Sequence, residues 1–223
     1  MKIIVTNKEY SIDEKITNIL DALEYIKTHH NSSLGFSYGC KSGICGSCAI
    51  RVNGIEKLSC ISNINNNDII EPLKNIPILK DLIVDNSNIE LKLKQSKAYL
   101  HNKSNEPISQ NDVDSIDRAS NCILCNSCYS SCPVFEINQN FLGPFALNKS
   151  YRYIKDKKES NSKEQFDAIQ ISGIWDCTLC GACSLVCPQN IDIKTNIMQL
   201  QNLSVQNGYS NPYFTNSGFD MVF

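Results

Sequence analysis

Twelve cysteines constrain what this chain of 223 residues can fold into more than any other feature of its sequence. They form three groups of four with none left over: Cys40, Cys45, Cys48 and Cys60; Cys122, Cys125, Cys128 and Cys132; and Cys177, Cys180, Cys183 and Cys187. Most gaps inside the groups are two to four residues, so successive thiolates can converge on one small inorganic core. Disulfide partners tolerate almost any separation, and this regular spacing therefore favours metal ligands.

The start of the chain gives a second argument against a disulfide framework. Residues 1–8 (MKIIVTNK) contain no apolar segment of signal-peptide length and no twin-arginine pair, so we expect a chain without its own export signal. Thiols in the cytosol are kept reduced. We therefore expect all twelve cysteines to be ligands.

The first group has the spacing of plant-type ferredoxins, in which gaps of four and two residues precede a longer gap. The last cysteine comes after a predicted hairpin, as a loop-and-strand site for a 2Fe–2S cluster requires. Four glycines between residues 35 and 46 would let backbone N–H groups approach the sulfurs. A zinc site is the alternative, although zinc favours two pairs of closely spaced cysteines. We assign the 2Fe–2S cluster to Cys40, Cys45, Cys48 and Cys60.

The second and third groups share gaps of two, two and three residues, and proline follows each last cysteine. In bacterial two-cluster ferredoxins, which have this spacing, the fourth cysteine of each run binds the other cluster. The pattern predicts one 4Fe–4S cluster on Cys122, Cys125, Cys128 and Cys187. It predicts a second cluster on Cys132, Cys177, Cys180 and Cys183. Crossed ligands require both runs to fold into one domain, and zinc is again the alternative.

Composition and charge exclude several other classes of protein. Hydrophobic residues make up 42% and charged residues 20% of the chain, as in soluble globular proteins. No apolar stretch approaches the ~20 residues that span a bilayer. The formal net charge of −2 gives no electrostatic reason to expect nucleic acid as a partner. We find no phosphate-binding glycine loop and no nucleophile–base motif, so no catalytic residue is assigned.

Local patterns predict a mixed α+β fold with two unlike halves. Residues 3–5 and 9–12 read as strands, and a helix capped by Thr17 follows them. Asn53-Gly54 is a strong hairpin signal between strands at 48–52 and 55–60. These elements predict a small module of the β-grasp kind over residues 1–95. The polar residues 95–117 predict a linker or exposed connection, and periodicity over 141–154 and 192–203 predicts a mainly α domain over residues 96–223.

Several longer stretches resemble the iron–sulfur subunits of succinate dehydrogenases and fumarate reductases. They are DALEYIK (21–27), GCKSGICGSC (39–48), PILKDLIVD (77–85), CILCNSC (122–128), FLGP (141–144) and WDCTLCGACSLVCP (175–188). The resemblance runs from near residue 1 to about residue 203. It implies a β-grasp 2Fe–2S ferredoxin domain followed by an all-α, bacterial ferredoxin-like domain with two clusters.

The same resemblance implies partners and a cellular location. A flavoprotein subunit would hold FAD and carry out the succinate–fumarate chemistry. A membrane-anchor or quinone-reactive subunit would exchange electrons with a quinone, and this chain would relay electrons between the two. We expect peripheral association with the cytoplasmic face of a membrane, or with the periplasmic face if a signal-bearing partner carries the chain across.

Two departures from the family pattern bear on the quinone end of this relay. Glu136 and Ile137 stand where succinate dehydrogenases carry a pair of tryptophans, and this resembles the fumarate reductase branch, as does Trp175. Most relatives have an apolar residue in place of Cys180 and bind a 3Fe–4S cluster with the remaining three cysteines. Cys180 is therefore either a fourth ligand of a 4Fe–4S cluster or a small packed residue beside a 3Fe–4S cluster.

Two other functions stay open at this point. One is a stand-alone, multi-cluster ferredoxin-like electron carrier, and the other is a structural zinc protein with no redox role. The helices beyond the cluster-binding cores and the FLGP stretch favour an obligate subunit, because a carrier needs only those cores.

Overall fold

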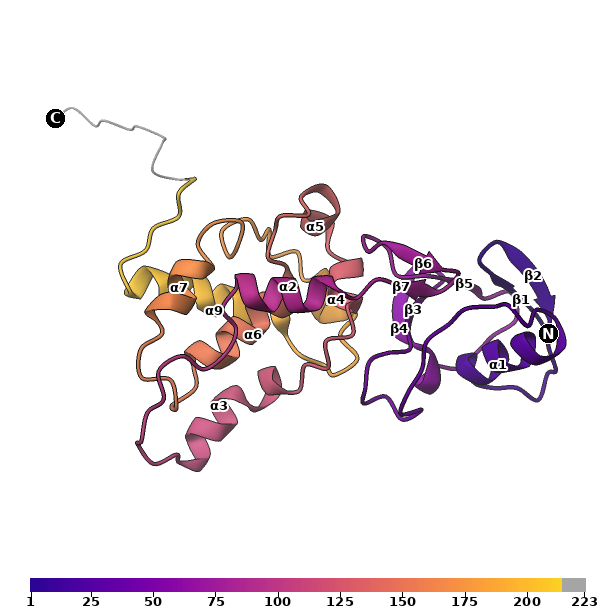
Figure 1. The fold of residues 1–223 in the computed structure, drawn as a ribbon, viewed down its shortest axis with the longest axis horizontal. Helices are drawn as coiled ribbons and strands as arrows, with labels where there is room; N and C mark the ends of the chain where they lie inside the picture. The colour runs from indigo at the N-terminus through magenta and orange to yellow at the C-terminus, as the bar shows by residue number, and fades with distance from the viewer. Residues whose placement is uncertain (214–223) are drawn as a thin grey trace.

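The N-terminal half is built on a five-stranded mixed sheet with one helix packed against it (Figure 1). This computed structural model describes residues 1–213. The strands are β1 (Lys2–Val5), β2 (Lys8–Ser11), β3 (Ala49–Val52), β4 (Ile55–Leu58) and β5 (Ile69–Glu71), in the order β2-β1-β5-β3-β4. β1 and β5 run parallel, and the other neighbouring pairs are antiparallel. A helix on such a sheet is the β-grasp arrangement expected from the sequence.

Both hairpins of this sheet turn through left-handed backbone. Thr6 and Asn7 have φ of 46° and 66°, and Asn53 and Gly54 have φ of 51° and 81°. Two successive residues at positive φ match the type I′ turn, whose twist suits the flanking strands. The hairpin predicted at Asn53-Gly54 is thus present, with Val52 paired to Ile55.

Helix α1 (Ile19–His29) covers the sheet through its apolar face. Its N-cap is Asn18, one residue after the expected Thr17. The Asn18 carboxamide oxygen accepts hydrogen bonds from the backbone N–H groups of Leu20 and Asp21 at 2.8 and 3.4 Å. Asparagine is among the best N-cap residues, because its short side chain reaches N–H groups that lack a partner in the helix. Thr17 is not the N-cap, because the helix begins at Ile19 and the capping position directly before it is Asn18.

A short hairpin and one helix connect the two halves. β6 (Ile78–Lys80) and β7 (Ile83–Val84) form the hairpin, and α2 (Asn88–Gln95) follows. Ile89 and Leu93 of α2 pack against the core of the helical half. The Lys92 ammonium, on the same helix, donates to the carbonyls of Gln139 and Asn140 at 2.8 and 3.3 Å. The change of core therefore comes before α2, several residues ahead of residue 95.

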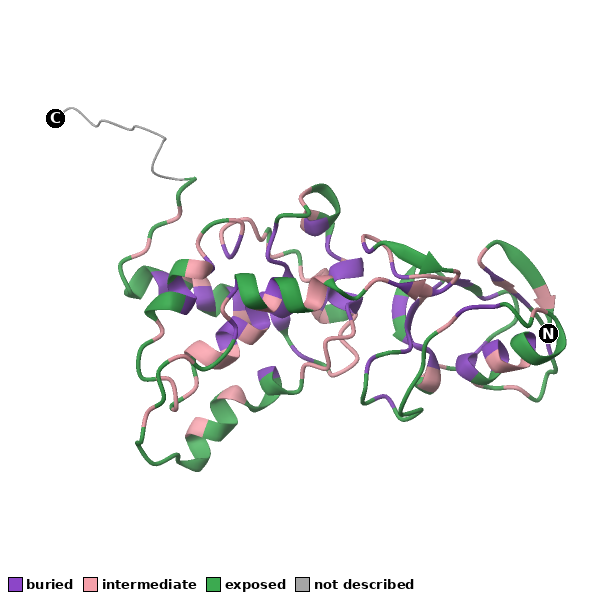
Figure 2. Cartoon of the chain, viewed as in Figure 1, coloured by how far each residue is buried: buried purple, intermediate pink, exposed green. Residues whose placement is uncertain are grey.

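The rest of the described chain is helical. Its helices are α3 (Gln110–Ser120), α4 (Ser127–Ser130), α5 (Pro133–Ile137), α6 (Pro144–Ile154), α7 (Lys163–Ala168), α8 (Ala182–Leu185) and α9 (Ile193–Gln206). The helices expected over 141–154 and 192–203 correspond to α6 and α9, which pack on each other. α3 occupies part of the polar stretch expected as a linker or exposed connection, and Figure 2 shows it mostly exposed. Its buried residue is Ala119.

A third apolar cluster joins the two halves. Cys48, Ala49, Leu58, Leu73, Ile76 and Val84 form its buried part. Ile123 and Cys125, from the start of the helical half, pack against these residues. The two cysteine-bearing regions are therefore neighbours across the contact between the halves (Figure 1).

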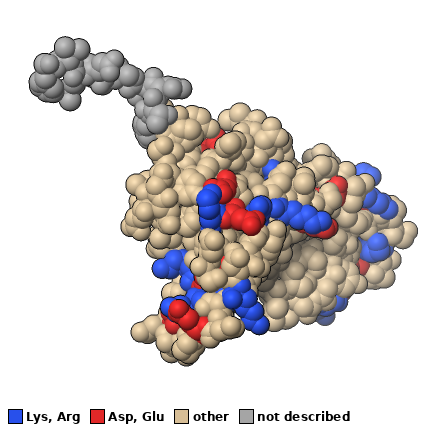
Figure 3. Space-filling model, turned by 60° about the vertical axis from the view of Figure 1, so that its left-hand side comes forward, with Lys and Arg blue, Asp and Glu red and all other residues tan. Residues whose placement is uncertain are grey.

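The surface carries mixed charge. On the face shown in Figure 3, basic and acidic side chains are interspersed with large uncharged areas. Several charges are paired, as in the ion pairs Lys74–Glu136 and Lys97–Glu164 at 2.7 and 2.6 Å. Within residues 1–213, no helix has both the length and the apolar character needed to cross a membrane.

Candidate functional site

Cys40 lies in an exposed loop whose backbone directs N–H groups at its sulfur. Its Sγ accepts hydrogen bonds at 3.3–3.4 Å from the backbone N–H groups of Ser42, Ile44 and Cys45. The Ser42 side chain and these N–H groups lower the pKa of the Cys40 thiol to about 6. Since the thiolate is the form that binds metals, this environment prepares Cys40 to be a ligand.

Cys48 and Cys60 meet at the base of the same loop. Cys48 directly precedes β3 and Cys60 lies in the turn η1 (Ser59–Ile61) after β4, so the hairpin brings their sulfurs to 3.3 Å. The backbone N–H of Gly43 donates to the Cys60 sulfur at 3.3 Å, while burial raises the pKa of Cys60 to about 11. Cys45 and Cys40 are exposed and Cys48 is buried. This group thus has one edge toward solvent and one toward the helical half.

The second and third groups line two separate cavities in the helical half. One cavity is lined by Cys122, Cys125, Cys128 and Cys187. The other is lined by Cys132, Cys177, Cys180 and Cys183. The last cysteine of each run thus lies in the cavity of the other run. We call these the first and second cavities, and their sets of four are the crossed sets expected from the bacterial two-cluster pattern.

The two cysteine runs repeat the same unusual backbone. Leu124 and Leu179, each two residues after the first cysteine of a run, have φ of 55° and 53°. Asn126 and Gly181, each one residue after the second cysteine, have φ of 65° and 83° and precede the short helices α4 and α8. Non-glycine residues rarely adopt positive φ. The repeated turn exposes N–H groups to sulfur, as in the bond from Leu179 to Cys177 Sγ at 3.4 Å.

Burial disfavours the charged form of several thiols that line the cavities, including Cys128 and Cys183. It holds the pKa of Cys128 well above its ordinary value and raises the pKa of Cys183 to about 12. Several thiolates confined together need compensating positive charge, which bound iron supplies. Cys180 is exposed although it lines the second cavity. This exposure does not fit the alternative in which Cys180 merely packs in an apolar core.

The thiols of the second and third groups surround two cavities. Within residues 1–213, no group of three or more His, Cys, Asp or Glu is arranged to hold a single metal ion. A structural zinc ion binds four ligands at about 2.0–2.3 Å from one centre. Sulfur donors spread around a cavity and served by backbone N–H groups fit a core of several irons and sulfides better.

The loop that carries the first cysteine group contacts residues of the first cavity at two points. A Cβ built on Gly46 would stand 2.8 Å from Cys125 Cβ and 3.0 Å from the Ile123 carbonyl oxygen. The Gln189 side-chain amide, just after Cys187-Pro188, donates to the Gly43 carbonyl at 3.0 Å. Both contacts join residues that neighbour cysteines of the two sites.

A cluster of three asparagines near this junction has no signal in the sequence. Asn126, fully buried, donates through its side-chain amide to the side chains of Asn86 and Asn88 at 2.8 and 3.2 Å. These two residues lie in the segment that connects the halves. The cluster ties the left-handed turn of the first run to that segment, and neither periodicity nor spacing distinguishes these asparagines from surface ones.

Glu136 and Ile137 lie at the surface, whereas Trp175 packs on the helical core. Glu136 pairs with Lys74 at 2.7 Å, and Ile137 is exposed. Trp175 packs against the helical core, and its indole N–H donates to the Gln170 side chain at 2.8 Å.

The two halves match two known domain families. Residues 4–90 match the 2Fe-2S iron-sulfur cluster binding domain, and residues 118–191 match the 4Fe-4S dicluster domain. Fold and sites together define an iron–sulfur protein with a 2Fe–2S domain followed by a 4Fe–4S domain.

Full-length relatives narrow this class. The chain is 35% identical over 186 residues to the fumarate reductase iron-sulfur subunit of Mycobacterium tuberculosis, covering 78% of this chain and 75% of the relative. It is 34% identical over 193 residues to the corresponding subunit of Escherichia coli O157:H7, with coverage of 82% and 79%. The chain belongs to the family of iron–sulfur subunits of fumarate reductases and succinate dehydrogenases, and it is an electron-transfer subunit.

A solved structure has the same fold. It is a chain of the Mycobacterium smegmatis Sdh1 complex in the apo form, with a TM-score of 0.83 and 21% sequence identity. The match covers 94% of this chain and 97% of that chain. The β-grasp module followed by the helical half is therefore an arrangement known from experiment.

Proposed function

We propose that this chain holds three iron–sulfur clusters in a row and relays single electrons between a flavoprotein and a membrane-side partner. When bound, the clusters supply the one-electron acceptors and donors. The residues of the chain bind them, set their separation and limit the access of water. In this proposal we assign no catalytic role toward the dicarboxylate to residues 1–213, and the dicarboxylate would react at the FAD of the flavoprotein subunit.

The arrangement of the three cysteine groups carries this proposal. The loop with Cys40 and Cys45 abuts the first cavity through Gly46 and Cys125. The run from Cys122 to Cys132 then contributes to both cavities. The groups therefore follow one another in space, from the N-terminal loop to the first cavity and on to the second, which is the order a relay needs.

Exposed apolar side chains beside the cysteines support contacts with partner subunits. Ile44, between Cys40 and Cys45, is 68% exposed, and Leu185, between Cys183 and Cys187, is 89% exposed. In a multi-subunit oxidoreductase, the flavoprotein would face the N-terminal loop. A membrane-anchor or quinone-reactive subunit would face the second cavity, leaving this chain peripheral to the membrane, on its cytoplasmic face in the simplest arrangement. The residues at the departures from the family pattern favour fumarate reduction as the physiological direction.

The proposed ligand sets are the first cysteine group and the two crossed sets of the second and third groups. Cys40, Cys45, Cys48 and Cys60 would bind a 2Fe–2S cluster. Cys122, Cys125, Cys128 and Cys187 would bind one 4Fe–4S cluster, and Cys132, Cys177, Cys180 and Cys183 a second. Backbone N–H groups directed at Cys40, Cys60 and Cys177 support binding of anionic sulfur in both halves.

Anaerobic purification of the full chain tests the proposal. Three such clusters correspond to about ten irons and ten acid-labile sulfides per chain. Electron paramagnetic resonance should then show the 2Fe–2S and 4Fe–4S signals after reduction with dithionite. Zinc without sulfide would instead identify a structural zinc protein.

A second measurement separates an obligate subunit from a stand-alone ferredoxin-like carrier. Coexpressed with a flavoprotein of the same complex, the chain should copurify with it and support fumarate reduction or succinate oxidation. Alone, it should do neither with any artificial donor or acceptor. Reduction of several unrelated oxidoreductases by the isolated chain, without stable association, would favour the carrier.

A further inference from the structure

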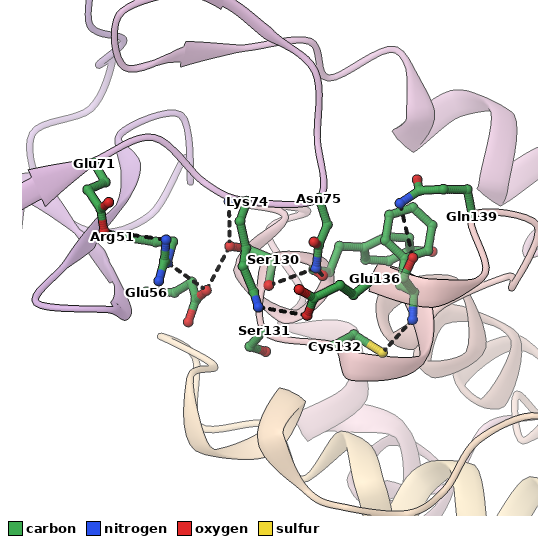
Figure 4. Close-up of polar contacts among 12 residues, drawn as sticks. Arg51, Glu56, Glu71, Lys74, Asn75, Ser130, Ser131, Cys132, Glu136 and Gln139 are labelled. Carbon is green, nitrogen blue, oxygen red and sulfur yellow. Dashed lines mark hydrogen bonds and ion pairs between the residues drawn. The ribbon is translucent and has the colours of Figure 1, made fainter. Parts of the chain in front are cut away.

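A buried carboxylate reaches across the contact between the two halves (Figure 4). Glu56 lies on β4 with its side chain buried, and it accepts a hydrogen bond from the Ser130 hydroxyl at 2.7 Å. Ser130 belongs to α4 and is fully buried. The two residues are 74 positions apart, so this bond is a tertiary contact between the halves.

Arg51 forms an ion pair with the Glu56 carboxylate. Its guanidinium lies between Glu56 and Glu71, with N–O distances of 3.6 and 3.4 Å (Figure 4). The Nε atom of Arg51 is buried and has no hydrogen-bond partner among the described residues. The ion pair therefore balances the charge of Glu56 but makes no hydrogen bond to it. The hydrogen bond to the Glu56 carboxylate comes from Ser130.

Ser130 also accepts a hydrogen bond from the N-terminal half. The backbone N–H of Lys74 donates to its hydroxyl oxygen at 3.0 Å. Beside it, the Asn75 side-chain amide donates to the carbonyl of Ser130 at 3.1 Å. One hydroxyl thus joins a backbone donor and a carboxylate of the opposite half, in a site without access to water. Breaking either of these bonds would leave a buried polar group unsatisfied, and this cost opposes separation of the two halves.

Both ends of this contact lie inside cysteine frameworks. Ser130 stands between Cys128, which lines the first cavity, and Cys132, which lines the second. Glu56 stands on the hairpin that runs from Cys48 to Cys60. A shift at the Glu56–Ser130 bond would therefore move one set of thiols relative to the others.

We propose that Glu56 and Ser130 are positioning residues for electron transfer between the two halves, and we call their bond the interdomain clamp. The inference rests on the proposed function, because it assumes clusters on both sides of the contact. The clamp fixes the separation over which one electron moves from the N-terminal site to the first cavity, or back; no bond to a ligand breaks and no proton is transferred. Electron transfer falls steeply with distance, so a loosened clamp slows it.

Two substitutions remove the clamp from opposite sides. Ser130→Ala deletes the hydroxyl, and Glu56→Leu replaces the acceptor with an apolar side chain of similar size. Loss of one partner of a buried, charged hydrogen bond should shift the balance between docked and separated halves by about tenfold to a hundredfold. If both residues act through one bond, the double variant should be no worse than the more affected single variant.

Two further variants are controls. Glu56→Gln keeps an oxygen that accepts from Ser130 and should restore most of the docking lost in Glu56→Leu. Lys74→Gln removes the exposed ion pair with Glu136 at the rim of the same contact but keeps the Lys74 backbone N–H. Exposed pairs contribute little, so Lys74→Gln should behave as the unaltered chain does.

The measurements use the full chain with its iron. In dithionite-reduced samples, Ser130→Ala and Glu56→Leu should weaken the magnetic interaction between the 2Fe–2S and 4Fe–4S signals while each signal keeps its own shape and intensity. Hydrogen–deuterium exchange at the Lys74 amide should accelerate in the same two variants. Photoreduction by a flavin should show slower transfer between the halves.

The outcomes distinguish the clamp from the function on which it rests. If Ser130→Ala retains full iron and sulfide but leaves the magnetic interaction, the amide exchange and the transfer rate unchanged, the clamp is refuted. Equal losses in Lys74→Gln and Ser130→Ala would also refute it, since the buried bond would then have no special role. If the unaltered chain shows no 2Fe–2S or 4Fe–4S signals, the proposed function itself fails.

Discussion

Gly46 lies against Cys125 so closely that a side chain at Gly46 would overlap the thiol-bearing residue of the opposite half. A Cβ there would stand 2.8 Å from Cys125 Cβ and 3.2 Å from Cys125 Cα, and Gly46 has φ of 75°. Two independent reasons, close approach and left-handed backbone, therefore require glycine at this position.

Gly46→Ala should separate the N-terminal loop from the first cavity. The left-handed backbone alone costs an alanine about 1–2 kcal/mol, and the contact with Cys125 adds displacement of the loop. We expect a weaker magnetic interaction between the reduced 2Fe–2S and 4Fe–4S centres. Gly54→Ala is the matched control: its φ is 81°, but its nearest neighbour is the flexible Arg51 side chain at 3.7 Å. It should lower stability without changing the interaction, and equal spectra for both variants would contradict the role of Gly46.

Cys180→Val should convert the centre in the second cavity. With Cys180 as fourth ligand, a 4Fe–4S cluster is diamagnetic when oxidised and gives no signal; three ligands leave one iron easily lost. The oxidised, anaerobically purified variant should show a new 3Fe–4S signal, while the reduced 2Fe–2S signal stays as in the unaltered chain. A stoichiometric 3Fe–4S signal in the unaltered chain would show that Cys180 is no ligand.

Glu159 should stabilise the chain only above acidic pH. Burial pushes its pKa upward, but hydrogen bonds from the backbone N–H groups of His101, Asn102 and Asn161 and from the Gln165 amide hold it below the usual 4.5. A carboxyl whose pKa is lower in the folded state stabilises that state above its unfolded pKa. This contribution is therefore complete above pH 4.5 and is lost as the pH falls through the folded-state value.

Glu159→Gln tests this linkage. At pH 7 the free energy of unfolding should fall by about 1 kcal/mol, because charged hydrogen bonds are replaced by neutral ones in a partly exposed site. The difference from the unaltered chain should shrink as the pH falls below 4.5. Glu90→Gln is the control, since Glu90 pairs only with exposed Lys94 and should have little effect. Denaturant unfolding at several pH values measures both, and a pH-independent difference would exclude the mechanism.

Tyr129→Phe should destabilise the helical half. Tyr129 is fully buried next to Phe135 and Phe145, and its hydroxyl donates to the Leu142 carbonyl. Phenylalanine keeps the ring packing but leaves that carbonyl unsatisfied, at a cost of about 1–3 kcal/mol in unfolding free energy. Tyr213→Phe removes a hydroxyl that bonds to Asp176 at the surface and should cost far less. Similar losses in the two variants would mean that burial of the Tyr129 hydroxyl contributes nothing.

We propose that the N-terminal module ends near residue 87, because α2 packs on the helical half. A fragment of residues 1–87 should fold and show the visible absorption of a 2Fe–2S centre. A fragment of residues 1–95 should do the same but aggregate more readily, since Ile89 and Leu93 would lose their packing surface. Absence of iron from a folded 1–87 fragment would contradict either the boundary or the four proposed ligands.

Local signals in the sequence predicted much of the fold. The Asn53-Gly54 turn dictates its hairpin through backbone preference, and apolar periodicity located α1, α6 and α9. β5 was not predicted, although it lies at the centre of the sheet, because three residues are too short to show alternation.

Part of the candidate site could be predicted from the sequence, and part of it could not. Regular spacing grouped the cysteines, because ligands of one core must be close in the chain or lie at equivalent places in a repeat. The Glu56–Ser130 bond and the contact of Gly46 with Cys125 had no such signal. Both join residues far apart in the chain, and each residue looks ordinary in its own segment. How the halves meet therefore had to come from the tertiary structure.

The exchange of last cysteines between the two runs has a consequence for biogenesis. Cys187 lies with the thiols of the first run and Cys132 with those of the second. Neither run holds all four cysteines of either cavity. Neither cavity therefore has its full set of thiols until both runs have folded together. With the ligand sets proposed above, the cluster in the first cavity could not gain its fourth ligand until Cys187 had been synthesised and had folded back onto the first run.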